Sequence, residues 1–328
     1  MKKAFDLVIL GHMAMDTVIH VENGERKVFK TSAGGAVTFG SIAAKTSEPG
    51  ARIGIATKVG KDLIPDLLDP LKAKKIDLSC MIVDEEALTT RFELIYEGGH
   101  RTVSCPARCS ALSFDDFPDE LWSARRFHIG SICGEISLLF IEKMGNGIID
   151  EQPVGIDLQG VLRDVHDDGT ISLISQGDAL DTTRKIYEIF GKRLVIKGDD
   201  FECTAVSGIE DPVQCIEYFL SEFSDVTVLL TMGRKGSYLG KNCDGNATIE
   251  KIPAFKPDRI VDETGAGDTY LVSYLSRIDN ASSCSFATCE EAALFASAAS
   301  SFLVEDKKFK GLQPAKKILE RVQKAVYF

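Results

Sequence analysis

Short apolar runs recur along the chain, and longer amphipathic stretches separate them. A run of four to eight apolar residues bounded by polar or turn residues is typical of a buried strand. The clearest example is rich in β-branched residues and lies between Asp225 and Gly233. Six such runs are predicted to be strands: Leu7–Leu10, Arg52–Lys58, Arg126–Ile129, Val154–Leu158, Leu194–Lys197 and Val226–Thr231.

The stretches between these runs have the spacing of amphipathic helices. Lys61–Ala73, Glu135–Gly145 and Pro212–Phe223 each separate two predicted strands, and Gln313–Val326 is predicted to be the last helix. Strands that alternate with helices indicate a doubly wound, mostly parallel sheet flanked by helices, which is an α/β fold. No linker rich in Pro, Gly or Ser interrupts the pattern, so residues 1–328 are predicted to form a single domain.

Two segments depart from this rhythm, because they alternate polar and apolar residues around a short turn. Thr17–Val21 and Lys27–Thr31 flank an Asn-Gly turn, and Thr89–Tyr96 and Arg101–Cys105 flank a Gly-Gly turn. Both segments are predicted to be β-hairpins. A hairpin does not fit inside a parallel sheet, so residues 17–31 and 89–105 are expected to form a small flanking sheet, whose exposed edges could pair two copies of the chain.

Composition narrows the classes of function. The 328 residues are 44% hydrophobic, and the net charge is −11, which argues against nucleic acid as the main partner. No apolar run approaches the roughly 20 residues of a membrane span. The nine cysteines have irregular spacing and no C-x-x-C pair, so reduced thiols in a cytoplasmic protein are expected, with Cys105 and Cys109 read as ordinary thiols.

The segment Asp262–Asp268, with the sequence DETGAGD, carries the strongest chemical signal. It precedes an apolar stretch, Ala266–Ile278, that is predicted to be a helix. Glycines at a helix start let its unpaired amides approach an anion, and Asp268 beside such a site suits a base that takes a proton from an attacking hydroxyl. The alternative is a glycine-rich helix cap with an ordinary first-turn Asp.

The same segment resembles the D-T-x-G-A-G-D signature of the ribokinase-like (PfkB) carbohydrate kinases. Four further elements follow that family's order: Gly11–Asp16, Gly34-Gly35, Asp199–Glu202 and Thr231–Gly236. The resemblance implies that Asp268 is the general base. It also implies that the amides of Gly265, Ala266 and Gly267 form an anion hole, and that the small sheet is a lid.

On the acceptor side, the resemblance implies that Asp16, Gly34 and Gly35 bind substrate hydroxyls. A turn-capping role is the alternative for Asp16. The family usually has Asn at the position of Phe39, which argues against ribose and fructose phosphate as substrates. The run Asp157–Arg163 is similar to that of the myo-inositol kinases of plants and archaea, which implies substrate contacts for Asp157, Gln159 and Arg163. Arg163 could instead pair with Asp164 or Asp167.

On the nucleotide side, the resemblance implies that the donor is ATP with Mg²⁺. Asp199 and Glu202 would hold the metal through water, although the same two residues also fit a helix capping box. Asp262 lies where the family places a K⁺ loop. The other expected nucleotide contacts are Lys197, Thr231, Gly233, Gly236 and Thr264.

These features together predict an ATP-dependent kinase that phosphorylates a hydroxyl of a small polyol or sugar, with myo-inositol as the substrate that the resemblance favours. A nucleoside kinase or another sugar kinase uses the same residues. It would need an aromatic shelf for a base, for which Phe29, Phe92 and Tyr96 are candidates. The rival of a different class is a non-catalytic protein that senses a sugar. His12 is expected to be structural.

Overall fold

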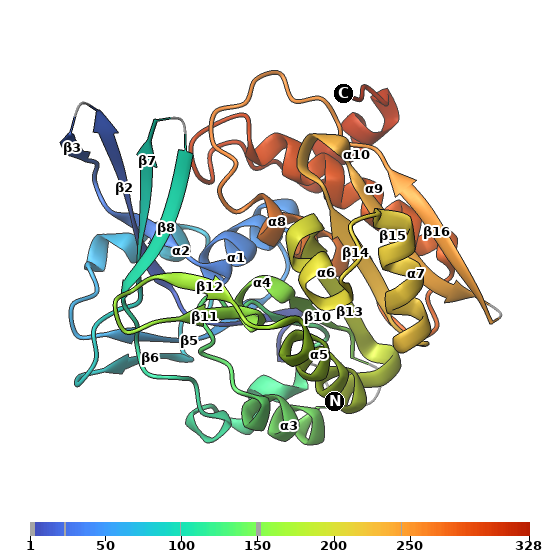
Figure 1. Cartoon of the computed structure of the whole chain (residues 1–328), viewed down its shortest axis with the longest axis horizontal. Helices are drawn as coiled ribbons and strands as arrows, with labels where there is room; N and C mark the ends of the chain where they lie inside the picture. Colours follow the sequence, from blue (N-terminus) through green and yellow to red (C-terminus); the bar gives the residue numbers. More distant parts are fainter. Residues whose placement is uncertain (1–3, 23, 99, 149–151, 244) are drawn as a thin grey trace.

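The computed structural model describes residues 4–22, 24–98, 100–148, 152–243 and 245–328. A nine-stranded sheet forms the centre (Figure 1). Its strands are parallel except at one edge, where β15 and β16 run antiparallel to their neighbours. The order across the sheet is β16 (Asn246–Ile252), β15 (Ser237–Cys243), β14 (Thr227–Thr231), β13 (Leu194–Asp199), β10 (Val154–Asp157), β9 (Phe127–Ile129), β1 (Leu7–Leu10), β5 (Ile53–Gly60) and β6 (Met81–Asp84).

The six strands predicted from apolar runs are all present, and each lies within three residues of its predicted bounds. Successive residues of a strand point to opposite faces of the sheet. In β1, Val8 and Leu10 therefore belong to one hydrophobic core, while Leu7 and Ile9 belong to another. Both faces are apolar, so both must be covered, which explains the continuous apolar runs in the sequence.

Helices cover both faces of the sheet (Figure 1). On each face, every helix contacts the next one in a row. The first row is α1, α8, α9 and α10, and the second row is α3, α5, α6 and α7. The first set comprises α1 (Ala36–Ser47), α8 (Ala266–Leu275), α9 (Phe286–Leu303) and α10 (Ala315–Lys324). The second set comprises α3 (Leu138–Gly147), α5 (Gln176–Phe190), α6 (Asp200–Ser207) and α7 (Pro212–Glu222). A four-residue helix, α4 (Leu158–Val161), follows β10 directly.

One predicted helix is wrong. Instead of a continuous helix over Lys61–Ala73, the structure has a 3₁₀ turn, Pro65–Leu68, followed by the five-residue α2 (Asp69–Ala73). The sequence contains a proline in each piece, Pro65 and Pro70, and each occupies the first turn of its helix. Proline is tolerated there but breaks a helix interior, so the stretch is divided.

The two predicted hairpins form antiparallel pairs in a separate five-stranded sheet. The hairpins are joined because β2 and β7 pair in parallel. The turn residues Asn23 and Gly99 lie outside the described residues. The sheet comprises β2 (Ala14–Glu22), β3 (Glu25–Val28), β4 (Ser32–Gly34), β7 (Arg91–Glu97) and β8 (His100–Ala107). A two-stranded ribbon, β11 (Arg163–Val165) and β12 (Ile171–Leu173), forms a separate sheet that contacts β8.

Two other expectations concern the cysteines and the membrane. All nine cysteines are free thiols, and Cys105 donates to the carbonyl of Ala107 at 3.3 Å. Among the helices that the structure describes, none is long and apolar enough to cross a bilayer.

Candidate active site

A cleft of about 470 Å³ lies between the carboxyl ends of β10, β13 and β14, the start of α8, and the small sheet. This volume falls within the range of small-ligand sites. Gly34 and Asp262 lie just outside the cleft wall. Gly34 lies against Asp16, and Asp262 is hydrogen-bonded to Thr264; both of these partners line the cleft. The other predicted site residues all line the cleft: Asp16, Gly35, Asp157, Gln159, Arg163, Lys197, Asp199, Glu202, Thr231, Gly233, Gly236, Thr264, Gly265, Ala266, Gly267 and Asp268.

Asp268 lies in the first turn of α8 and borders the cleft. Gly265 precedes the helix with a positive φ of 79° and caps it. Burial, followed by the charge of Asp157, raises the pKa of Asp268 to about 7, against the opposing charges of Lys197 and Arg163. A carboxyl group that titrates near neutrality can accept a proton at physiological pH and release it again.

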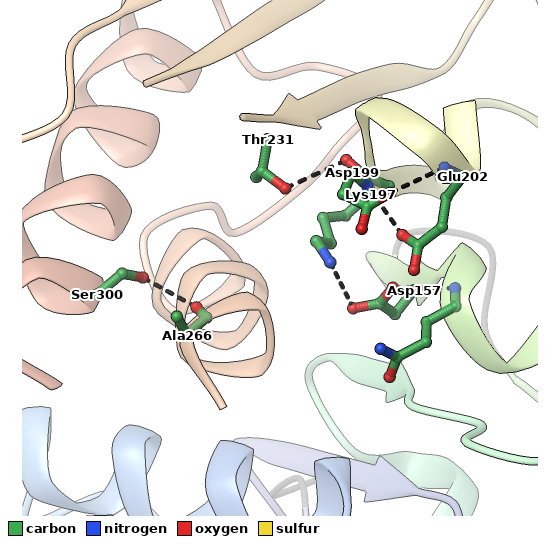
Figure 2. Close-up of polar contacts among 9 residues, drawn as sticks. Asp157, Lys197, Asp199, Glu202, Thr231, Ala266 and Ser300 are labelled. Atoms are coloured by element: carbon green, nitrogen blue, oxygen red, sulfur yellow. Dashed lines mark hydrogen bonds and ion pairs between the residues drawn. The ribbon is translucent and has the colours of Figure 1, made fainter. Parts of the chain in front are cut away.

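An ion pair lies beneath the start of α8. Lys197 Nζ is 2.9 Å from Asp157 Oδ2, and both side chains are about 94% buried (Figure 2). Burial alone would lower the pKa of Lys197, but the carboxylates of Asp157 and Glu202 raise it above its ordinary value. Lys197 is therefore a fixed positive charge in the cleft wall. Asp157 also accepts from the amide of Gln159 at 3.1 Å, so its carboxylate is held from two sides.

Asp199 and Glu202 form the capping box that the sequence allows. Glu202 N donates to Asp199 Oδ1 and Asp199 N donates to Glu202 Oε2, both at 2.8 Å (Figure 2). Burial raises the pKa of Glu202 to about 7; Lys197 opposes this shift, while Asp157 and Asp199 add to it. Three carboxylates thus crowd one part of the wall. A divalent cation bound through water would relieve this repulsion, so these residues fit Mg²⁺.

The remaining nucleotide-side residues surround the same part of the cleft. Thr231 Oγ1 donates to the carbonyl of Gly198 at 3.3 Å, which ties the ends of β13 and β14 together. Ser300 Oγ donates to the carbonyl of Ala266 at 3.0 Å and holds the first turn of α8 against α9 (Figure 2). The Ala266 amide donates to the carbonyl of Glu263 at 3.2 Å, so it is already engaged, unlike the free donor that the resemblance implies.

Asp262 has partners of its own. Its carboxylate accepts from the amide of Thr264 at 3.0 Å and from the amide of Lys308 at 3.2 Å. These bonds fix the loop that enters α8 against the segment between α9 and α10.

On the acceptor side, Asp16 lies on β2 and Gly34 on β4, which pairs with it. A side chain at Gly34 would overlap the Asp16 carboxylate, so glycine is needed for this close approach. Gly35 follows as the N-cap of α1. The structure therefore brings together two motifs that stand almost twenty residues apart in the sequence.

Arg163 does not pair with Asp164 or Asp167, the alternative that the sequence left open. Its Nη1 donates to the carbonyl of Ile132 at 3.0 Å, and its guanidinium lies 5.9 Å from the centre of the Phe92 ring. These contacts hold Arg163 in the cleft wall between the small sheet and β10.

An apolar wall adjoins the polar residues of the acceptor side, and sequence reasoning identified only one of its members as a candidate. Phe92 and Leu94 come from β7, Val103 comes from β8, and Ile132 follows β9. The alternation of β7 could have indicated this inner face. The other two proposed shelf residues, Phe29 and Tyr96, lie away from the cleft, where they pack on His20 and are 41% and 38% exposed.

Phe39 completes this wall and reaches the start of α8. It is 3% exposed, and a side chain at Gly265 would overlap its ring. Phe309 packs on the other side of Phe39, with ring centres 4.9 Å apart. The aromatic ring of Phe39 thus occupies the position where the resemblance leads one to expect the side-chain amide of an Asn.

His12 is structural, as expected. Its Nε2 donates to the carbonyl of Ser110 at 3.0 Å, so Nδ1 accepts from Thr90 Oγ1 at 2.8 Å. Glu135, which is also buried, accepts from the amides of His12, Ile132 and Cys133. His12, Cys133 and Glu135 lie close enough to hold a metal, but these bonds already occupy the nitrogens of His12 and the carboxylate of Glu135.

Residues 161–315 match the pfkB family of carbohydrate kinases. The chain has the ribokinase-like fold. The matched region contains Lys197, Asp199, Glu202 and the start of α8, whereas Asp16, Gly34 and Gly35 lie before it. The comparisons support a phosphotransferase that acts on an alcohol group.

Two curated relatives align with most of this ribokinase-like chain. It is 27% identical to a cytidine kinase of Thermococcus kodakarensis, over 83% of this chain and 87% of the relative. It is 26% identical to a nucleoside kinase of Methanothermobacter thermautotrophicus, over 92% of this chain and 90% of the relative.

Solved structures show the same fold at lower identity. A ribokinase from Giardia lamblia has a TM-score of 0.77 at 20% identity, covering 98% of this chain and 99% of that chain. A nucleoside kinase from Methanocaldococcus jannaschii has a TM-score of 0.70 at 20% identity, covering 97% and 98%. A pyrophosphate-dependent kinase in complex with myo-inositol has a TM-score of 0.68 at 18% identity, covering 96% and 99%.

Proposed function

We propose that this protein is an ATP-dependent kinase that phosphorylates a hydroxyl group of a nucleoside. The observation that carries the proposal is one cleft with two kinds of wall. Asp268 and the start of α8 line it, while on the acceptor side Phe92 and its apolar neighbours lie beside Asp16 and Arg163.

In the proposed reaction, the acceptor oxygen attacks the γ-phosphorus of ATP and the bond between that phosphorus and the β,γ-bridging oxygen breaks. Asp268 takes the proton of the attacking hydroxyl as the new bond forms, and ADP leaves with the electron pair. The amides of Gly265 and Gly267 stabilise the equatorial oxygens. When Mg²⁺ is bound near Asp199 and Glu202, it neutralises charge on the phosphates.

The acceptor side suits a molecule with one polar and one flat apolar part. Asp16 can accept hydrogen bonds from vicinal hydroxyls, and the guanidinium of Arg163 can donate to oxygens. Phe92, Leu94, Val103 and Ile132 offer contacts that a nucleobase can use and a polyol cannot. The similarity to a cytidine kinase and a nucleoside kinase supports the same substrate class.

Myo-inositol is the second candidate. The polar set of Asp16, Gln159 and Arg163 favours it, and a kinase of this fold has been seen with myo-inositol bound. The two candidates differ in their contacts with the apolar wall. A nucleobase would pack against it, whereas a cyclic polyol has no flat apolar part to do so.

A substrate panel tests the proposal. ADP release is measured with ATP and Mg²⁺ against cytidine, uridine, adenosine, guanosine, ribose, fructose 6-phosphate and myo-inositol. The proposal predicts the highest kcat/KM for a nucleoside. A clear preference for myo-inositol would replace the substrate class, and no ADP release with any acceptor would overturn the kinase function.

Two further roles are proposed for the surroundings of the site. The small sheet would close over the bound acceptor and exclude water, which competes for the phosphoryl group. A monovalent cation would bind near Asp262 and polarise the anion hole. Replacing K⁺ with a bulky organic cation should then lower turnover, and unchanged turnover would reject the cation site.

A further inference from the structure

The segment that follows α10 returns to the cleft. Ala325 has a positive φ of 50° and turns the chain out of the helix. Lys256 N then donates to the carbonyl of Val326 at 2.9 Å, and Phe328 N donates to the carbonyl of Ala254 at 3.2 Å. Residues 326–328 thus lie along residues 254–256 as a short antiparallel pair.

This segment is well anchored. The ring of Tyr327 packs on the buried Phe255 at 4.9 Å between centres. In α10, Arg321 donates to Glu305 at 2.7 Å and to Ser301 at 2.9 Å, which fixes the helix to the end of α9. Tyr327 remains 41% exposed, and the next residue, Phe328, lines the cleft.

Phe328 lines the cleft together with the loop that follows β16. Phe255, Pro257 and Ile260 are the apolar residues of this loop that line it. The C-terminus lies near α10, whereas the small sheet lies at the left edge of the view (Figure 1), so this end of the cleft lies away from the acceptor side.

Three serines of α9 line this end, and each donates its hydroxyl hydrogen to a backbone carbonyl. Ser297 Oγ donates to the carbonyl of Pro253 at 2.7 Å, and Ser301 Oγ donates to the carbonyl of Ala298 at 2.7 Å. Ser300 is bonded to Ala266 as described above. Their hydroxyl hydrogens are therefore committed, and the surface that remains for a ligand is largely apolar.

We propose that Phe328 forms one wall of the pocket for the nucleobase of the phosphoryl donor and binds that base by stacking. The inference rests on the proposed use of ATP. Phe328 is 57% exposed, which leaves a large apolar ring open to solvent at the edge of the cleft. A flat aromatic base would cover this ring, while the triphosphate would extend from there toward α8 and Asp268.

The test compares Phe328→Ala with the parent protein at saturating acceptor. Base–aromatic stacking contributes about 1–3 kcal/mol, so the KM for ATP is expected to rise at least about 5-fold. The kcat at saturating ATP should change by less than about a factor of two, because the base is remote from the reacting atoms. The KM for the acceptor should not change. Since every base has an aromatic face, the KM for GTP should rise similarly.

Matched variants make the outcome specific. Val326→Ala alters an equally exposed residue of the same segment that does not line the cleft, and it should leave the KM for ATP unchanged. Phe328→Tyr keeps an aromatic ring and should retain the parent KM. An unchanged KM for ATP in Phe328→Ala, with the parent melting temperature, would overturn the inference. That result differs from failure of the kinase function, in which the parent itself releases no ADP.

Discussion

Lys197 occupies the space where a side chain at Gly267 would begin. Its Nζ lies 2.8 Å from the position that a Cβ atom at residue 267 would take. The charge of Lys197 therefore reaches the first turn of α8, next to Asp268, and glycine is needed at position 267 to admit it. Asp157 holds Lys197 from below. The ion pair thus connects β10 and β13 to the start of the helix that carries the proposed base.

Replacing Lys197 with Met should destabilise the protein, because it leaves Asp157 buried without its partner. The free energy of unfolding should fall by about 3–5 kcal/mol in chemical denaturation. The double variant with Asp157→Asn should recover part of this loss, since Asn removes the charge and can still accept from the amide of Gln159. If the double variant were no more stable than Lys197→Met, the ion pair would not be the cause.

The pH dependence of kcat/KM for the acceptor should show an acidic limb near pH 7. The proposed base works only when it is deprotonated, and its pKa is raised to about 7, so activity falls as the pH drops through that value. Asp157 is one cause of the raised pKa, so Asp157→Asn should move the limb to lower pH. Titration of the nucleotide itself would not respond to this substitution. A limb that stayed in place would assign it to another group.

Substitution of Phe92 should distinguish a nucleoside acceptor from a polyol acceptor. Phe92→Leu keeps an apolar side chain in the small sheet but removes the flat ring, so the KM for the nucleoside should rise at least about 5-fold. The KM for myo-inositol should change much less. Phe29→Leu is the matched control, because Phe29 pairs with β2 in the other hairpin of the small sheet and does not line the cleft. Equal effects of the two substitutions would contradict the proposed base contact.

The central sheet could be predicted from the sequence because its strands are buried on both faces, so each is a continuous apolar run. The helix over Lys61–Ala73 was predicted wrongly, because hydrophobic spacing outweighed Pro65 and Pro70. The strand Ser237–Cys243 was not predicted, since Lys241 and Asn242 interrupt its apolar pattern. Local patterns therefore identify elements best where burial is complete and no breaker residue intervenes.

The site was partly predictable for a different reason. Motifs at strand ends and helix starts indicate a cleft, because parallel strands end at a common edge. The partner of Lys197 could not be predicted, since nothing in the sequence places β10 beside β13, which begins 40 residues further on. Phe328 could not be predicted either, because it reaches the cleft only through pairing with residues 254–256.

The most direct measurement is turnover by Asp268→Asn, together with its binding of ATP. The account predicts that turnover falls by at least about 10²-fold while ATP binding is nearly unchanged, because the base acts only in the transition state. Folding serves as the control. The folded pKa of Asp268 lies above its ordinary value of 3.8, so its ionisation opposes folding as the pH rises from about 4 to 7. Asn avoids this cost, and the variant should melt no lower than the parent at pH 8. Near-normal turnover in a folded Asp268→Asn protein would contradict the account.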